Sequence, residues 1–155
     1  MSDEETILPE MGFAALFSAE ERKNLGNFGE FISCNDGDTL IEEGKNQNSL
    51  FLIVFGTFHV QTATLGRPVL LGNLRAGDSV GEVNIFDSGN ASASVVSKSL
   101  SQVWKIDRVR LEQYLEAHPQ EAARLLVSVA TQLSKRLRKT NAKVAMAREA
   151  MLDSF

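Results

Sequence analysis

The residues best suited to chemistry lie between positions 76 and 95. Gly81 and Glu82 stand together where the sequence predicts the start of a short helix, just after a Gly-Asp turn. A helix start presents unpaired backbone N–H groups and the positive end of the helix dipole, so it favours anions. Gly81 lets a ligand approach the backbone closely, and the Glu82 carboxylate can accept a hydrogen bond from a sugar hydroxyl. These residues are therefore candidates for binding an anion that also carries a hydroxyl group.

The same stretch has a purely structural interpretation. Gly77-Asp78 and the Ser-Gly-Asn sequence at 88–90 are ordinary turn signals. A single Gly-Glu pair is not specific for any ligand. The assignment of a site therefore depends on the wider pattern around these residues.

That wider pattern resembles the phosphate-binding cassette of cyclic-nucleotide-binding domains. The cassette consists of Gly-Glu, a short apolar helix, a turn, and then Arg-Ala-x-Ser/Thr-Val. Gly81 and Glu82 match its beginning, and residues 93–95 match its end. The family arginine falls on Ala91, which carries no charge. In the family the glutamate accepts a hydrogen bond from the ribose 2′-hydroxyl, and the arginine binds the cyclic phosphate.

The departure at Ala91 sets the expected affinity. A charge-assisted hydrogen bond contributes about 1.5–3 kcal/mol, and a helix start returns about 0.3–1 kcal/mol. The nearest arginines in the sequence, Arg75 and Arg108, lie on neighbouring predicted turns. The resemblance therefore implies a cyclic nucleotide ligand, with cyclic AMP as the first candidate, bound more weakly than in the family, or a cyclic nucleotide of another kind.

The elements around this stretch are predicted to be strands. Turn clusters separate short apolar runs at 39–41, 50–60, 69–74, 94–96 and 103–106. Regular turns between short strands indicate a sandwich or a barrel. The run 50–60 is too continuous for a strand with one buried face, so it predicts a central strand that bends at Gly56. The order of the turn glycines also resembles the family, which implies an eight-stranded jelly-roll β-roll with flanking helices.

The N-terminal part is predicted to contain an acidic leader and short helices. Residues 1–11 form the leader, and a short helix is expected through Phe13 and Phe17. Ser18 and Glu21 have the spacing of a capping box, which opens a helix that ends near Gly26. This opening also resembles the N-terminal helix of the family, although an ordinary surface helix would have the same sequence.

After residue 106 the apolar period becomes helical. Asp107 is a good N-cap for one helix, and Pro119 can begin the next, which extends to about residue 151. Its apolar residues follow heptads, and such a pattern is typical of a two-stranded coiled coil. The alternative is a helix packed along its own domain. We predict a parallel homodimer through Leu126, Ala130, Leu133, Leu137, Thr140, Val144 and Met151.

Residues 134–144 carry a second resemblance, to the dimer helix of the bacterial catabolite activators. There a Thr and a Ser contact the adenine base, one from each subunit. Thr140 matches the Thr, and Asn141, which can donate and accept, stands at the Ser. Thr140 could equally be a polar layer that fixes the register of a coiled coil. The ligand site implied by both resemblances consists of Gly81, Glu82, Val83, Asn84, Ala91, Ser92, Thr140 and Asn141.

Composition excludes several other functions. The net charge of −4 argues against nonspecific binding to nucleic acid. The single cysteine, Cys34, cannot form an intrachain disulfide, which suits a reducing cytoplasm. The longest apolar run has six residues and cannot span a membrane. No nucleophile stands beside a base, and no metal-ligand spacing is present around His59 or His118, so we expect neither catalysis nor a bound metal.

The sequence therefore predicts three segments, with a leader at 1–11, a cyclic-nucleotide-binding-like β-roll at 12–118 and a dimer helix at 119–155. The expected function is a non-catalytic bacterial sensor that has no obligatory cofactor and signals through its dimer helix. In the transcription-factor branch a helix-turn-helix domain follows this helix, and the chain stops at Phe155. We therefore expect no direct DNA binding. The alternative is a ligand-free module of the same fold that binds a protein partner.

Overall fold

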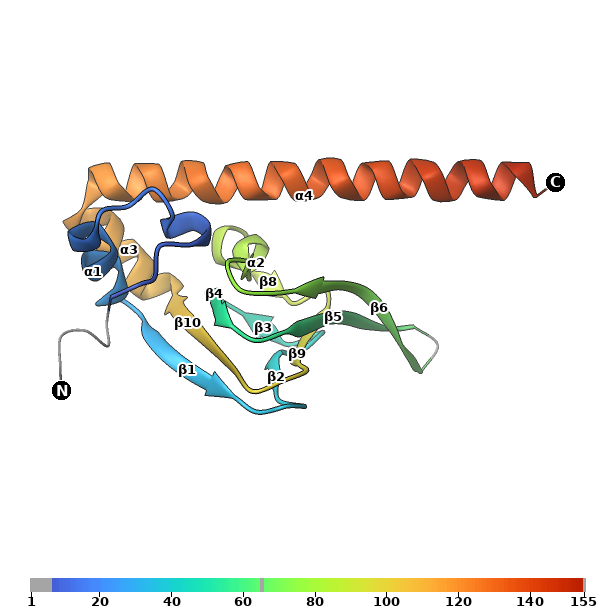
Figure 1. The fold of residues 1–155 in the computed structure, drawn as a ribbon, viewed down its shortest axis with the longest axis horizontal. Coiled ribbons are helices and arrows are strands. Elements are labelled where there is room, and N and C mark those ends of the chain that lie inside the picture. The colour runs from blue at the N-terminus through green and yellow to red at the C-terminus, as the bar shows by residue number, and fades with distance from the viewer. Residues whose placement is uncertain (1–6, 65, 155) are drawn as a thin grey trace.

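The computed structural model describes residues 7–64 and 66–154 as a β-roll with small helices at one end and one long helix along its side (Figure 1). The helices are α1 (Ala19–Gly26), α2 (Glu82–Phe86), α3 (Arg108–Ala117) and α4 (Pro119–Asp153), with a 3-10 turn at Gly12–Ala14. The strands are β1 (Glu30–Cys34), β2 (Thr39–Ile41), β3 (Asn46–Gln47), β4 (Ser49–Phe55), β5 (Phe58–Thr64), β6 (Arg67–Leu74), β7 (Ser79–Val80), β8 (Gly89–Asn90), β9 (Ser94–Ser97) and β10 (Ser101–Asp107).

The strands form two four-stranded antiparallel sheets and one short pair. One sheet has the order β1-β10-β4-β7, the other has the order β2-β9-β5-β6, and β3 pairs with β8. The predicted mainly-β fold with a β-roll is confirmed. The described chain has ten strands instead of the eight expected, and three of them, β3, β7 and β8, are two-residue strands that no local apolar pattern indicates.

The expected single strand over residues 50–60 is wrong in one respect. The run divides at Gly56 into β4 and β5, which belong to different sheets. Gly56 has φ +101°, and a Cβ at this position would collide with Ser101. The apolar run is continuous because β4 is buried on both faces and Phe58, at the start of β5, is also fully buried.

The N-terminal helix follows its local signals. The Ser18 hydroxyl accepts a hydrogen bond from the Glu21 N–H (3.2 Å), and the Glu21 carboxylate accepts one from the Ser18 N–H (3.0 Å). This confirms the predicted capping box. Leu8 is fully buried, and its carbonyl accepts a hydrogen bond from Arg22. The packed part of the chain therefore begins before residue 11, where the sequence placed the end of the leader; residues 1–6 lie outside the described chain.

Two apolar clusters fill the interior. One lies between the helices and the first sheet, around Trp104, whose indole N–H donates to the Gly26 carbonyl (3.3 Å). The other lies inside the β-roll, between the two sheets, and includes Ile53, Phe58 and Val95. The first cluster attaches the helices to the roll, and the second supports the wall that carries Ala91.

The C-terminal helices begin as predicted. The Asp107 carboxylate accepts a hydrogen bond from the Arg110 N–H (2.8 Å), and Pro119 is in the first turn of α4. The 35 residues of α4 give it a length of about 52 Å. Among the described residues, no helix combines the length and the apolarity that crossing a membrane requires.

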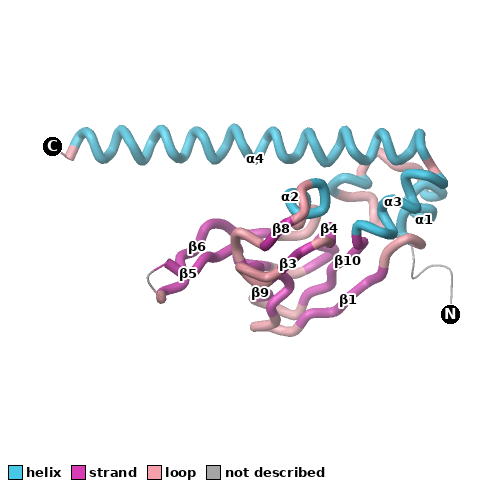
Figure 2. Tube along the Cα trace, turned by 180° about the vertical axis from the view of Figure 1, so that it is seen from behind, coloured by secondary structure: helices cyan, strands magenta, loops and turns pink. Residues whose placement is uncertain are grey.

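Only the first half of α4 packs on its own domain. Ala122, Leu125 and Val129 are buried in the helical core cluster, and Leu133 packs against it. Every described residue from 137 onward is exposed. Figure 2 shows this second half extending past α2, on the same side of the molecule as the end of the β5–β6 hairpin.

Candidate functional site

A cavity of about 660 Å³ lies between the β-roll and α4. Its wall includes the turn before α2, the residues after β8, and part of α4. Of the eight residues predicted for the ligand site, all except Asn141 line this cavity. The fold thus brings residues 81–84, 91–92 and 140 to one place, although they are far apart in the sequence.

Gly81 is required by packing inside the protein. It is the N-cap of α2 and has φ +95°, a conformation that side chains rarely adopt. A Cβ here would collide with the Ser49 carbonyl oxygen and lie 2.7 Å from Gln47 Nε2. The close approach predicted for a ligand is therefore made by the backbone of β4.

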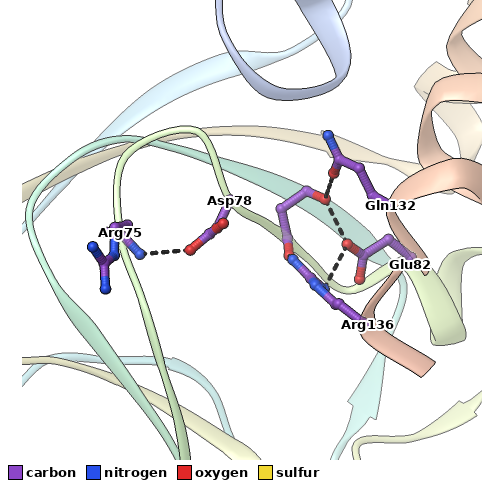
Figure 3. Close-up of polar contacts among 6 residues, drawn as sticks. Arg75, Asp78, Glu82, Gln132 and Arg136 are labelled. Atoms are coloured by element: carbon purple, nitrogen blue, oxygen red, sulfur yellow. Dashed lines mark hydrogen bonds and ion pairs between the residues drawn. The ribbon is translucent and has the colours of Figure 1, made fainter. Parts of the chain in front are cut away.

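Glu82 is a buried carboxylate that already has partners (Figure 3). Its side chain is 4% exposed. Its Oε1 accepts a hydrogen bond from the Ser79 hydroxyl (2.6 Å) and forms an ion pair with Arg136 Nη1 (3.1 Å). Arg136 Nη2 also donates to the Ser79 carbonyl oxygen. One arginine of α4 thus holds the carboxylate and the backbone of β7, so a ligand hydroxyl would share Glu82 with Arg136.

Ser79 and Gln132 extend this network. Ser79 Oγ lies 2.9 Å from Gln132 Oε1 and 2.6 Å from Glu82 Oε1, but a hydroxyl has one proton to donate. The two arrangements are compatible when the Gln132 amide is turned so that its NH₂ donates to Ser79 Oγ and the hydroxyl proton goes to Glu82. Both Arg136 and Gln132 therefore hold the first half of α4 to the cassette.

Ala91 forms part of an apolar wall. It is 6% exposed, its N–H donates to the Lys45 carbonyl (2.8 Å), and its carbonyl accepts from the Gly44 N–H (2.8 Å). Its backbone N–H is therefore engaged within the roll. The other apolar side chains that line the cavity from the roll include Ile41, Val60, Leu74, Val80 and Val95.

The opposite wall is basic. Arg136, Lys139 and Lys143 of α4 line the cavity together with Thr140, and Arg75 lines it from the turn before β7. The sequence indicated a basic stretch in this helix but did not show which side it faced. The signal that could have identified these residues is helical spacing from Val129 and Leu133, because residues three, four and seven positions apart share a face.

Other reactive groups lie away from this cavity. Burial and the charge of Asp38 raise the pKa of the Cys34 thiol, which disfavours the reactive thiolate. Within residues 7–64 and 66–154, no group of three or more His, Cys, Asp or Glu side chains could hold a metal ion. The cavity combines an apolar wall, a buried carboxylate and a basic helix.

Comparison with known proteins shows which family the chain belongs to. The sequence model of a family described as the cyclic nucleotide-binding domain matches residues 31–118, more than half of the chain. The chain belongs to the cyclic nucleotide-binding domain family. A curated relative, the cAMP-activated global transcriptional regulator CRP of Salmonella typhimurium, is 31% identical over 108 residues, which are 68% of this chain. The predicted family is thus confirmed.

The fold of this cyclic nucleotide-binding domain is similar to solved structures. A cyclic nucleotide-binding domain from Methylobacillus flagellatus superimposes with a TM-score of 0.78 at 24% identity, over 83% of this chain and 72% of that one. Among curated proteins, Glutaminase 1 of Bradyrhizobium diazoefficiens is 29% identical over 141 residues, which are 91% of this chain but 22% of the glutaminase. The chain spans about half the length of the CRP relative it matches.

The residues predicted for the dimer seam differ in how exposed they are along α4. Leu137, Val144 and Met151 are 61%, 61% and 66% exposed. Ala130 and Thr140 are exposed and Leu126 is half-buried, whereas Leu133 packs against the core of its own chain. The exposed residues remain predictions for a dimer seam, and Leu133 already has an intrachain role.

Proposed function

We propose that this domain is a non-catalytic regulatory sensor whose cavity binds a cyclic nucleotide, with cyclic AMP as the first candidate. The observation that carries the proposal is that the Gly81-Glu82 turn, Ala91 and Thr140 line one cavity. Membership of the cyclic nucleotide-binding domain family and similarity to a CRP support it. The ligand binds over the Gly81-Glu82 turn, and the cytoplasm is the compartment that suits such a sensor.

The sensor signals as a homodimer through α4. Support comes from Leu137, Val144 and Met151, which recur every seven residues on an exposed part of the helix. Burying about 100 Å² of apolar side chain contributes about 2.5 kcal/mol, so three such residues from each chain are a substantial driving force. Asn141 lies outside the cavity lining of its own chain and contacts the ligand from the partner subunit.

The test is calorimetric titration of the protein with cyclic AMP, cyclic GMP and cyclic dinucleotides. We expect one of them to bind, and we expect Glu82→Ala to weaken that binding about 10- to 150-fold, the effect of losing one charge-assisted hydrogen bond. An unchanged affinity in the Glu82→Ala variant would place the ligand elsewhere. No heat with any cyclic nucleotide at millimolar concentration would refute the sensor proposal.

Two observations favour a second candidate function, a ligand-free module that binds a protein partner. The Glu82 carboxylate is bound by Arg136, and the position of the family arginine is occupied by a buried alanine. A domain of this kind would keep the β-roll and α4 as a docking scaffold. The same titration separates the two functions, because a ligand-free module gives no heat while it remains folded.

A further inference from the structure

We infer that the cavity binds organic anions with the charged end on Lys139 and Lys143 of α4 and the apolar end against the wall that contains Ala91. The inference rests on the proposed function in taking this cavity as the ligand site. It adds the orientation and the chemical class of the ligand. It also makes α4 itself the element that binds the charge.

The charges around the cavity support this orientation. Four cationic side chains line it (Arg75, Arg136, Lys139 and Lys143), against two carboxylates, Asp78 and Glu82. The cavity is therefore locally positive in a protein whose net charge is −4. Such a positive cavity attracts small anions, even though the protein as a whole is negatively charged.

The pairing of these charges shows which cations are available. Glu82 is bound by Arg136. Asp78 accepts a hydrogen bond from the Arg75 backbone N–H (2.9 Å), which leaves the Arg75 guanidinium without an acidic partner among the described residues. Lys139 and Lys143 have no acidic partner in the described part of the chain. They lie four positions apart on α4, so they share one face of the helix, and both line the cavity. Each ammonium has three donors, and the two together can bind a phosphate or a carboxylate.

The opposite end of the cavity disfavours a charge. Ala91, Ile41 and Val95 are at most 6% exposed and form an apolar patch in the lining of the cavity, beside the polar residues Asn84 and Ser92. The Ala91 N–H is already bonded to the Lys45 carbonyl, so it offers no donor to an anion. Burying an uncompensated charge against such a wall is costly, whereas an aromatic or aliphatic group gains from it. The ligand is therefore amphipathic, with an apolar body and one anionic group.

The predicted dimer is compatible with this site. In the heptad register that places Leu137 and Val144 at position a, Lys143 occupies position g and Lys139 occupies position c. These positions flank the seam or lie outside it, so pairing of two α4 helices does not bury them. A ligand held by Lys139 and Lys143 would link the β-roll to the second half of α4, which otherwise packs on nothing in the described chain.

The test uses 1-naphthyl phosphate as a probe, because it joins a flat apolar body to a phosphate. Its affinity is measured by calorimetry and compared with those of inorganic phosphate and of neutral 1-naphthol. We expect the whole probe to bind at least tenfold more tightly than either fragment. We expect Lys139→Gln/Lys143→Gln to weaken it about tenfold, the lower end of the effect of a charge-assisted hydrogen bond.

The matched control is Lys135→Gln/Arg138→Gln, which removes two charges from exposed positions of the same helix outside the cavity lining. It should change the affinity less than threefold. Equal losses in the two double variants, binding of inorganic phosphate as tight as that of the probe, or no binding of the probe at millimolar concentration would each overturn the inference.

The two proposals fail separately. If a cyclic nucleotide binds with an affinity that Lys139→Gln/Lys143→Gln leaves unchanged, the orientation is wrong and the sensor proposal stands. If 1-naphthyl phosphate binds through the lysines but no cyclic nucleotide does, the cavity is a site for another organic anion and the cyclic nucleotide proposal fails.

Discussion

The ion pair between Arg136 and Glu82 predicts an asymmetric response to mutation. The Glu82 side chain is 4% exposed, and that of Arg136 is 38% exposed. Replacing Arg136 with Gln leaves a buried carboxylate with Ser79 as its remaining partner. Replacing Glu82 with Gln leaves an arginine that can turn into water, while the new amide oxygen still accepts from Ser79.

The magnitudes follow from this difference in burial. Losing a fully buried partner costs about 3–5 kcal/mol, and the exposure of Arg136 reduces this to about 1.5–3 kcal/mol for Arg136→Gln. Glu82→Gln should cost about 0–1 kcal/mol, because the arginine can be rehydrated. The double variant removes the buried charge and should be about 1–2 kcal/mol more stable than Arg136→Gln alone, so the two changes are not additive.

The assay is urea denaturation at one fixed protein concentration, since assembly would make stability depend on concentration. Arg138→Gln is the matched control, because Arg138 is exposed two positions away and should change stability by less than about 0.5 kcal/mol. The reasoning is refuted if Glu82→Gln costs as much as Arg136→Gln, or if the two costs add in the double variant.

Three further predictions test the turn, the core and the assembly. Gly81→Ala should destabilise the fold by more than about 1 kcal/mol in thermal melts, because its Cβ meets the Ser49 carbonyl; Gly66→Ala, also at positive φ but in open space, should cost less. Tyr114→Phe should leave stability at pH 7 unchanged within about 1 kcal/mol, since the buried hydroxyl has no partner among the described residues. Burial and the Glu121 charge raise the pKa of Tyr114, so above pH 10 the unfolded wild-type chain releases a proton that the folded chain keeps, and the wild type should lose stability relative to the variant. Leu137→Asp should give monomers in sedimentation experiments, while Ala142→Asp on the outer face of the same helix should remain dimeric; a monomeric wild type at tens of micromolar would contradict the proposed seam.

Much of the fold could be predicted because its signals are local. Ser18 and Glu21 bond to each other's backbone within one turn, and Asp107 caps the helix that follows it directly. Such signals act over three residues and do not depend on the rest of the chain. The division of residues 50–60 into two strands was not predicted, because an apolar run is the same whether its residues belong to one sheet or two.

The candidate site could be predicted only in part, because the contacts that form it join residues far apart in the sequence. The Gly81-Glu82 turn is visible in the sequence, but the residue that binds Glu82 is 54 positions away. The requirement for glycine at position 81 also arises from a distant segment, the Ser49 carbonyl. The sequence alone shows the types and the spacing of these residues, but it does not show which distant residues contact them.

The sequence by itself determined the turns, the helix ends, the heptads of α4 and the absence of an arginine at position 91. The tertiary structure decided which side of α4 faces the cavity. That side is fixed when Ala122, Leu125 and Val129 enter the core, because burying these apolar side chains sets the rotation of the whole rigid helix. The rotation then carries Arg136 to Glu82 and places Lys139 and Lys143 at the cavity, an outcome that no residue of α4 specifies locally.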